Sequence, residues 1–164
     1  MNYELNPKVR IGHVHLTVAN LERAVSFYRD LLGFTVTARF GKSAAFLSSG
    51  NYHHHIGLNT WAGPDATPPP KGHSGLYHFA ILYPNRYELA KAFKILWETK
   101  YPIEGASDHG ITESIYINDP DGNGIELYCD RPRDEWPTDD DGNLILLTQP
   151  LDLPDLLSEL NIQD

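Results

Sequence analysis

Apolar and polar residues alternate near the start of the chain. Residues 11–18, IGHVHLTV, combine this alternation with several β-branched residues, and they predict a strand. Neighbouring side chains of a strand point to opposite faces, so His13 and His15 are predicted to share one face.

The spacing of apolar residues then changes to that of a helix. Asn20 is a candidate N-cap before residues 21–32, and Gly33 is suited to close the helix. The apolar stripe comprises Leu21, Ala24, Val25, Tyr28, Leu31 and Leu32. Strand candidates follow at residues 34–39, 44–48 and 52–59. The first half is therefore predicted as β-α-β-β-β.

The same order of elements returns after a segment rich in proline and glycine. That segment, residues 60–75, is predicted to be irregular and to act as a lid or a connector. Asn85 and Glu88 form a capping-box pattern before a helix over residues 86–100, which Pro102 is expected to end. The apolar stripe of this helix comprises Leu89, Ala90, Phe93, Leu96 and Trp97. The strand candidates of this second β-α-β-β-β series are residues 76–83, 103–106, 113–118 and 125–129.

The last two strands are predicted to form a hairpin that carries an unusual carboxylate. The sequence DPDGNG at residues 119–124 has turn composition, because proline presets φ while glycine and asparagine tolerate positive φ. Glu126 follows on the second strand, between two apolar residues. A carboxylate on an apolar strand is costly unless it is paired or bound to a metal. Tyr116 on the first strand and His109 upstream of it add further polar chemistry to this hairpin.

The two halves form an internal repeat. Laying IGHVHLTVAN over LYHFAILYPN matches His13 with His78, and laying HIGL over GIEL matches Gly57 with Glu126. Equivalent strands of a duplicated fold meet around one cleft, so two imidazoles and one carboxylate are predicted to converge there. Such a set leaves open coordination positions on one side, which suits Fe(II) or Mn(II) better than a closed structural zinc site. His15 shares the face of His13, and spacing does not choose between them.

Composition narrows the class of function. The chain has 164 residues, a net charge of −9 and no basic stripe, which argues against nucleic acid and an anionic membrane as partners. We see no signal-peptide pattern and no apolar run long enough to cross a bilayer. Cys129 is the single cysteine, so an intrachain disulfide is impossible and a cytoplasmic protein is expected. A homodimer is the default expectation for its assembly.

The end of the chain differs in character. It is charged and rich in turn residues, and the acidic run at residues 139–141 is interpreted as a solvated turn rather than a calcium loop. Residues 151–160 predict a short amphipathic helix, packed on the domain or used in a dimer contact. The expected organisation is one domain over residues 1–132, with modules at 9–60 and 76–132, followed by a C-terminal tail over 133–164.

On these segments the chain resembles the vicinal oxygen chelate superfamily of glyoxalases, bleomycin resistance proteins and dioxygenases. HVHLTVANLERAVSFYRDLLGF looks like its first βα unit, and DPDGNGIELY looks like its closing hairpin. The order His109, Tyr116, Glu126 is similar to that of extradiol dioxygenases of the catechol 2,3-dioxygenase kind. The resemblance covers roughly residues 9–132. It implies an α+β fold in which two βαβββ modules form a U-shaped cleft.

The resemblance also implies roles for single residues and a reaction. Tyr116 would hydrogen-bond the bound catechol, His109 would be the acid/base histidine, and His54 would face the oxygen side of the iron, with its two neighbouring histidines as alternatives. The metal ligands, for Fe(II) or Mn(II), would be His13, His78 and Glu126. Apart from the resemblance, we expect His15 to line the substrate cleft or to support a metal ligand, and Trp61 either to line the cleft or to serve in aromatic packing. The implied function is ring cleavage of a small catechol-type aromatic substrate by O2.

Two other functions stay open within the same superfamily. A glyoxalase-type isomerase commonly uses a further carboxylate at the place that Gly57 occupies here, so the sequence disfavours this function. A resistance-type protein that binds an aromatic drug without turnover usually lacks the metal ligands, whereas all three are present here. Classical extradiol enzymes often carry two double-module domains, and this chain has room for one.

Overall fold

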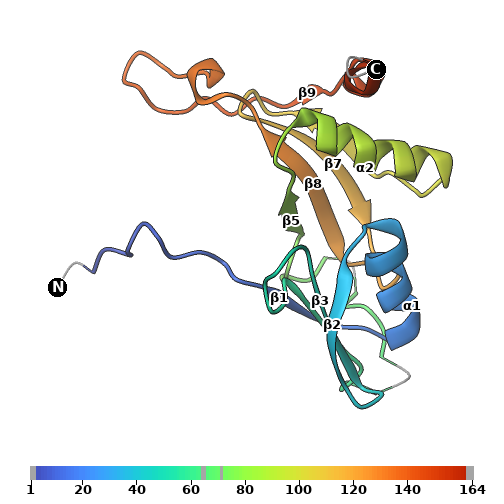
Figure 1. Cartoon of the computed structure of the whole chain (residues 1–164). Coiled ribbons are helices and arrows are strands. Elements are labelled where there is room, and N and C mark those ends of the chain that lie inside the picture. The colour runs from blue at the N-terminus through green and yellow to red at the C-terminus, as the bar shows by residue number, and fades with distance from the viewer. Residues whose placement is uncertain (1–2, 64–65, 71, 162–164) are drawn as a thin grey trace. The chain divides into compact units, whose positions relative to one another are not determined.

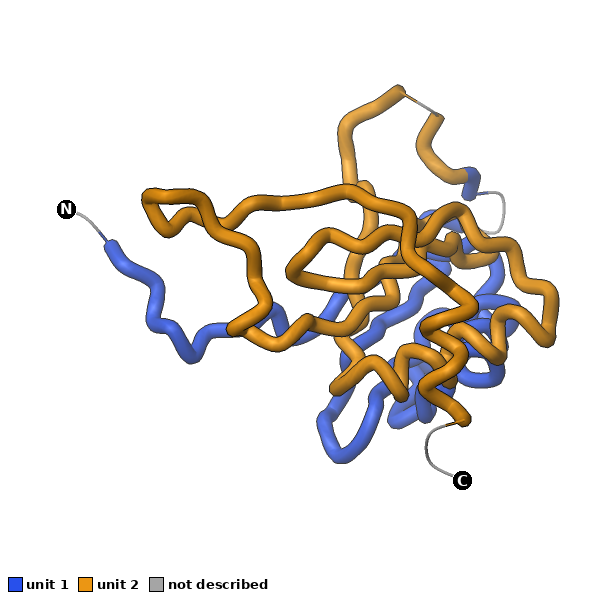
Figure 2. The backbone as a smooth tube through the Cα atoms, turned by 90° about the horizontal axis from the view of Figure 1, so that it is seen from above, with its two compact units in different colours: residues 1–67 blue, residues 68–164 orange. Residues whose placement is uncertain are grey.

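The computed structural model describes residues 3–63, 66–70 and 72–161. The chain divides into two compact units, residues 1–67 and residues 68–164, which are coloured separately in Figure 2. Each unit contains one module of the predicted repeat, and the second also contains the C-terminal tail. Three residues of the predicted irregular segment (64, 65 and 71) and three of the predicted tail (162–164) lie outside the described residues.

The first unit is a four-stranded sheet with one helix. The strand order is β1-β4-β3-β2, with β1 and β4 parallel and the other pairs antiparallel. The helix α1 (Leu21–Ser26) begins at Asn20, whose Oδ1 accepts a hydrogen bond from the Arg23 N–H at 2.9 Å, as predicted. It continues as a π turn, η1 (Phe27–Leu31), in which Phe27 is buried although regular helical spacing does not predict it. The strands are β1 (Val14–Thr17), β2 (Thr35–Phe40), β3 (Ala44–Ser48) and β4 (Ile56–Asn59).

The second unit repeats this plan and adds a strand. Its sheet has the order β5-β8-β7-β6-β9, and β5 and β8 are parallel. The helix α2 (Arg86–Glu98) begins at Asn85, whose Oδ1 accepts the Glu88 N–H at 2.9 Å, so the predicted cap is confirmed. The strands are β5 (Phe79–Leu82), β6 (Gly105–Asp108), β7 (Thr112–Asn118), β8 (Gly124–Asp130) and β9 (Gln149–Pro150).

The strand registers support the internal repeat. The parallel pair β1/β4 sets His15 opposite Gly57, and the parallel pair β5/β8 sets Ala80 opposite Glu126. The last strand of each module therefore carries Gly57 and Glu126 at equivalent places. The α+β fold with two βαβββ modules is confirmed, and among the described residues no helix has the length and apolar character to span a membrane.

The strand predicted over residues 52–59 and the second helix are both shorter than predicted. The strand predicted over residues 52–59 begins only at Ile56, because the Thr37 hydroxyl donates to the His53 carbonyl at 2.7 Å in place of a strand partner. His54 therefore lies in the irregular segment before β4. The second helix ends at Glu98, ahead of Pro102, and Trp97 is 66% exposed rather than part of the buried stripe.

The C-terminal tail packs on the second unit. The predicted short helix is present as α3 (Leu153–Ser158), followed by the 3-10 turn η3 (Glu159–Asn161), and both contact α2 (Figure 1). A 3-10 turn, η2 (Arg133–Glu135), begins the tail. The strand β9 was not predicted, because two residues are too few to show a period in sequence.

Candidate metal and catalytic site

His78 and Glu126 form the centre of the candidate site in the second unit. His78 directly precedes β5, Glu126 lies on the neighbouring strand β8, and His78 Nε2 is 3.0 Å from Glu126 Oε2. Gly124 permits this approach of the two segments, because a Cβ there would overlap the Tyr77 carbonyl oxygen. The side chains of His78 and Glu126 are 29% and 15% exposed, so a small ligand can reach them.

Tyr116 and His109 extend this pair into a continuous line of hydrogen bonds. The β7/β8 register sets Tyr116 opposite Glu126, and the Tyr116 hydroxyl donates to Glu126 Oε1 at 3.0 Å. His109 Nε2 lies 2.7 Å from the same hydroxyl, and His109 Nδ1 lies 2.8 Å from the Leu147 carbonyl oxygen. Burial, followed by the charge of Glu126, raises the pKa of Tyr116 to about 12, so its hydroxyl is held protonated.

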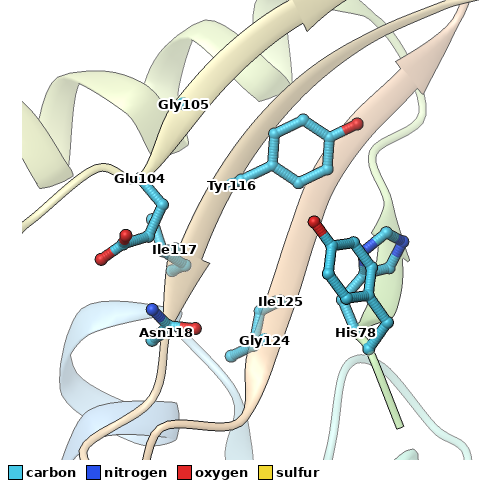
Figure 3. A pocket seen from close by; sticks show the side chains of 9 residues that line it. His78, Glu104, Gly105, Tyr116, Ile117, Asn118, Gly124 and Ile125 are labelled. Atoms are coloured by element: carbon cyan, nitrogen blue, oxygen red, sulfur yellow. The ribbon is translucent and has the colours of Figure 1, made fainter. Parts of the chain in front are cut away.

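A pocket of about 330 Å³ opens beside this line, within the second unit. Figure 3 shows His78 and Tyr116 toward one end of it, and Glu104 and Asn118 toward the other. This volume suits a single small ligand. The sequence did not single out Glu104 or Asn118, since a carboxylate at a strand end and an amide beside a turn are ordinary surface patterns. The remaining lining residues are Tyr77, Gly105, Ile117, Gly124 and Ile125.

The first unit contains the other predicted histidines. His13 and His15 both lie on the exposed face of β1 and its approach, as alternation predicted. The ring of His54 is 4.5 Å from that of His13, centroid to centroid. The ring of His15 lies 5.8 Å from Phe46 and 5.5 Å from Trp61. His13 and His54 therefore meet on one face, and His15 and Trp61 meet beside them.

Among the three adjacent histidines, His54 is the one whose ring packs on His13. The imidazole of His55 is turned toward Ser48, with 3.0 Å between His55 Nδ1 and the Ser48 hydroxyl. His53 is exposed, and its Nδ1 lies 2.7 Å from the Nδ1 of His54. Burial lowers the pKa of His54, and the nearby imidazoles of His13 and His53 lower it further, so His54 is favoured in its neutral form.

The absence of a side chain at Gly57 leaves room for the imidazole ring of His15. A Cβ built on Gly57 would lie 2.9 Å from the Cγ of His15, well inside contact distance. The equivalent place in the second unit carries Glu126 opposite the small side chain of Ala80. Each module therefore combines one large and one minimal residue at this pair of positions.

The donor set fits a divalent metal with open positions. Imidazole nitrogen and carboxylate oxygen are the ligand types that Fe(II) and Mn(II) take, and the structure brings one of each together in His78 and Glu126. Within the described residues of each unit, no group of three or more His, Cys, Asp or Glu side chains is placed to hold a metal ion. His13 belongs to the first unit, so the three-residue ligand set stays a prediction. Cys129 is not a competing nucleophile, because burial raises the pKa of its thiol to about 11.

Known proteins resemble this chain in sequence and in fold. The model described as the Glyoxalase/Bleomycin resistance protein/Dioxygenase superfamily matches residues 10–127. The chain is 39% identical over 156 residues to a catechol-2,3-dioxygenase of Bacillus subtilis, with 94% of this chain and 53% of that protein covered. It is 31% identical over 124 residues to biphenyl-2,3-diol 1,2-dioxygenase 3 of Rhodococcus globerulus, with 74% and 63% covered. The chain thus spans between about half and two thirds of the length of these two relatives.

Solved structures agree with the fold. A glyoxalase/dioxygenase from Nostoc punctiforme superposes with a TM-score of 0.65 at 22% identity, covering 80% of this chain and 99% of that one. At this identity the match bears on the fold alone. Because the superfamily model spans both modules of the repeat, from the approach to β1 into β8, this chain belongs to the glyoxalase/bleomycin resistance protein/dioxygenase superfamily.

Proposed function

We propose that this protein is an extradiol ring-cleaving dioxygenase that acts on small catechol-type aromatic substrates with O2. The observation that carries the proposal is the hydrogen-bonded line Glu126–Tyr116–His109 beside His78, at the edge of the pocket. The 39% identity to a protein named catechol-2,3-dioxygenase supports it. That relative is about twice as long as this chain, so its activity is assigned to this chain only as a proposal.

His13, His78 and Glu126 would hold the metal, with Fe(II) as the first candidate and Mn(II) as the second. When bound there, the ion would supply a Lewis acid for the two catechol oxygens and one-electron chemistry toward O2. His15 and Trp61 would line the substrate site.

The other residues of the site act on the substrate and its protons. The Tyr116 hydroxyl, protonated because its pKa is about 12, donates to Glu126 in the free protein and would donate to a catechol oxygen instead when substrate binds. His109 Nε2 exchanges a proton through that hydroxyl during ring opening. His54, favoured in its neutral form, would be the base that faces the oxygen side of the metal. A homodimer and a cytoplasmic location remain expectations from the sequence.

One feature of the first unit counts against a glyoxalase-type isomerase. The further carboxylate that such enzymes commonly use would replace Gly57, where even a Cβ would lie 2.9 Å from the His15 ring. A drug-binding protein without turnover is the third candidate. It is disfavoured because His78 and Glu126 already form a pair with metal-ligand chemistry.

The proposal is tested by loading the purified protein with Fe(II) without oxygen, measuring bound metal, and then following O2 uptake with catechol. We expect bound iron and uptake in the wild type. Glu126→Gln should lose most of the metal, because a neutral amide is a poor ligand for Fe(II), while Glu98→Gln on the exposed face of α2 should retain it. Bound metal without uptake would instead favour the isomerase, and absence of metal binding in the wild type would favour the drug-binding protein.

A further inference from the structure

The main chain of Leu147, in the C-terminal tail, bonds twice to His109. The Leu147 N–H donates to the His109 carbonyl oxygen at 3.1 Å, and the Leu147 carbonyl oxygen accepts from His109 Nδ1 at 2.8 Å. Leu147 thus binds both the backbone and the imidazole of the residue that carries the acid/base role in the proposed function.

The backbone at Gly110, directly after His109, lies close against Leu147 and Pro137 of the C-terminal tail. Gly110 has φ +76, and a Cβ there would lie 3.1 Å from both Leu147 Cδ1 and Pro137 Cγ. A side chain at position 110 would therefore be strained and would also press the tail away. Further along, the Trp136 indole N–H donates to the Arg131 carbonyl at 2.8 Å and holds the start of the tail on the end of β8.

Two contacts hold the other end of this segment. The strand β9 pairs with β6, where Gln149 lies opposite Asp108, the residue before His109. Beyond it, α3 and η3 are held on α2 by Arg86, whose guanidinium donates to Asp155 and Glu159 at 2.7 Å each. The segment that contains Leu147 is therefore anchored on the second unit both before Leu147, at Trp136, and after it, at β9 and α3.

The hydrogen bond to Leu147 decides which imidazole nitrogen of His109 carries the proton. A backbone carbonyl only accepts, so Nδ1 must donate and must be protonated. Nε2, 2.7 Å from the Tyr116 hydroxyl, is then the nitrogen that titrates: when protonated it donates to the hydroxyl, which donates to Glu126, and when neutral its lone pair accepts the hydroxyl proton in place of Glu126. Any proton that the ring gains or loses is thereby confined to the nitrogen that faces Tyr116.

We infer that the C-terminal segment 133–161 is a positioning element that fixes the orientation and the Nδ1–H tautomer of His109, through the main chain of Leu147. Its effect on turnover rests on the proposed function, but the tautomer itself does not. Leu147 is a positioning residue, since it acts through His109.

The hairpin turn before Leu147 offers a mild way to weaken this contact. The Asp139 carboxylate accepts the backbone N–H groups of Asp141 and Asn143 at 3.0 and 2.8 Å and the Asn143 side-chain amide at 3.1 Å. Asp139→Ala removes all three bonds at a distance from the site. Asp140→Ala is the matched control, because no bond of Asp140 within this turn is described, and it removes one acidic residue from the same exposed turn.

The first measurement is nitrogen-15 NMR of the histidine rings in the metal-free protein near neutral pH, with the signals assigned by their loss in His109→Asn. We expect the neutral ring of His109 to carry its proton on Nδ1, although a histidine in water favours Nε2. A proton on Nε2 in the wild-type protein overturns the inference. Since neither metal nor substrate is present, this result does not depend on dioxygenase activity.

The second measurement compares Asp139→Ala with Asp140→Ala. In Asp139→Ala we expect faster hydrogen exchange of the Leu147 amide, a mixture of His109 tautomers, and a kcat lower by about 10-fold with little change in KM. Asp140→Ala should match the wild type in all of these. Faster exchange at Leu147 with an unchanged tautomer would overturn the inference. Absence of O2 uptake in the wild type would overturn only the proposed function.

Discussion

Glu126 shows how a single carboxylate is accommodated on a mostly apolar strand. One of its oxygens lies 3.0 Å from His78 Nε2 and the other accepts from the Tyr116 hydroxyl at 3.0 Å. The sequence argument required this carboxylate to be paired or bound to a metal, and the structure gives it two partners. The chemistry of the site therefore depends on how these two partners are themselves held.

His109→Asn separates metal binding from proton transfer. His109 contacts Tyr116 and Leu147 and not the proposed ligands, so the variant should keep its Fe(II) content. An amide does not titrate near neutral pH, so O2 uptake with catechol should fall by about 100-fold or more. His73→Asn, in the exposed segment before β5, is the control and should behave as the wild type. Turnover at the wild-type rate in His109→Asn would remove His109 from the mechanism.

We expect that position 57 must be glycine because the imidazole ring of His15 lies directly against it. Gly57→Ala would bring a Cβ to 2.9 Å from His15 Cγ, so we expect the free energy of unfolding to fall by about 1–3 kcal/mol. In a His15→Ala background the same substitution should cost much less, because the ring is gone. Urea unfolding of the four proteins in a double-mutant cycle gives the coupling. An equal loss in both backgrounds would show that something other than the His15 ring requires glycine.

Helices and strands with a local signal were predictable, and those that depend on a distant partner were not. The caps at Asn20 and Asn85 confirmed both helix starts, because the capping bond is made within three residues. The start of β4 was missed because a hydroxyl on β2, that of Thr37, takes the His53 carbonyl. The strand β9 exists only through its pairing with β6, which no local pattern reveals.

Glu113 joins three elements of the second unit. It lies on β7, is 3% exposed, and accepts from Arg86 Nε of α2 at 2.7 Å and from Arg131 at the end of β8 at 2.8 Å. Glu113→Gln removes the charge that two guanidinium groups share, and we expect a loss of about 3–5 kcal/mol in the free energy of unfolding. Glu88→Gln breaks an exposed pair with Lys91 and should cost less than about 1 kcal/mol. Similar urea midpoints for the two variants would contradict a structural role for the buried network.

Across the molecule, acid should weaken folding in both units. Asp108 illustrates the sign: burial raises its pKa, but hydrogen bonds from Arg131 and Gly110 outweigh burial and leave the pKa below the ordinary value of 3.8. A group with a depressed folded pKa contributes stability above its unfolded pKa, and this contribution is lost as the pH falls through the folded value. The pKa is lowered in the same direction for Glu22, Asp30 and Asp139.

We therefore expect the urea midpoint to begin to fall below about pH 6.5, where the depressed pKa of His54 favours the unfolded chain, and to fall further below about pH 4, where the carboxylates are protonated. Asp108→Asn should show a smaller fall, because asparagine has no carboxyl to protonate. A midpoint that rises on acidification would contradict the assignment of these pairs.

The candidate site was predictable as far as the repeat determines it. Two short sequence matches predict that Gly57 and Glu126 occupy equivalent positions in the two modules, and the strand registers agree. The role of Leu147 was not predictable, because a main-chain carbonyl has no side-chain signature. The choice between His13 and His15 was also left open by sequence, since both lie on the same exposed face of the first unit.

The proposed ligand set draws on both units, so metal binding should stabilise both together. A ligand that binds only the folded state adds about 2.7 kcal/mol at 100 times its dissociation constant. With Mn(II), which is stable in air, we expect thermal unfolding followed at Trp61 in the first unit and at Trp136 in the second to shift upward to one midpoint. Single-tryptophan variants provide the two probes. His13→Ala should abolish the shift at both, and His15→Ala should retain it. The reverse pattern would assign the ligand to His15, and a shift confined to Trp136 would mean that the first unit contributes no ligand.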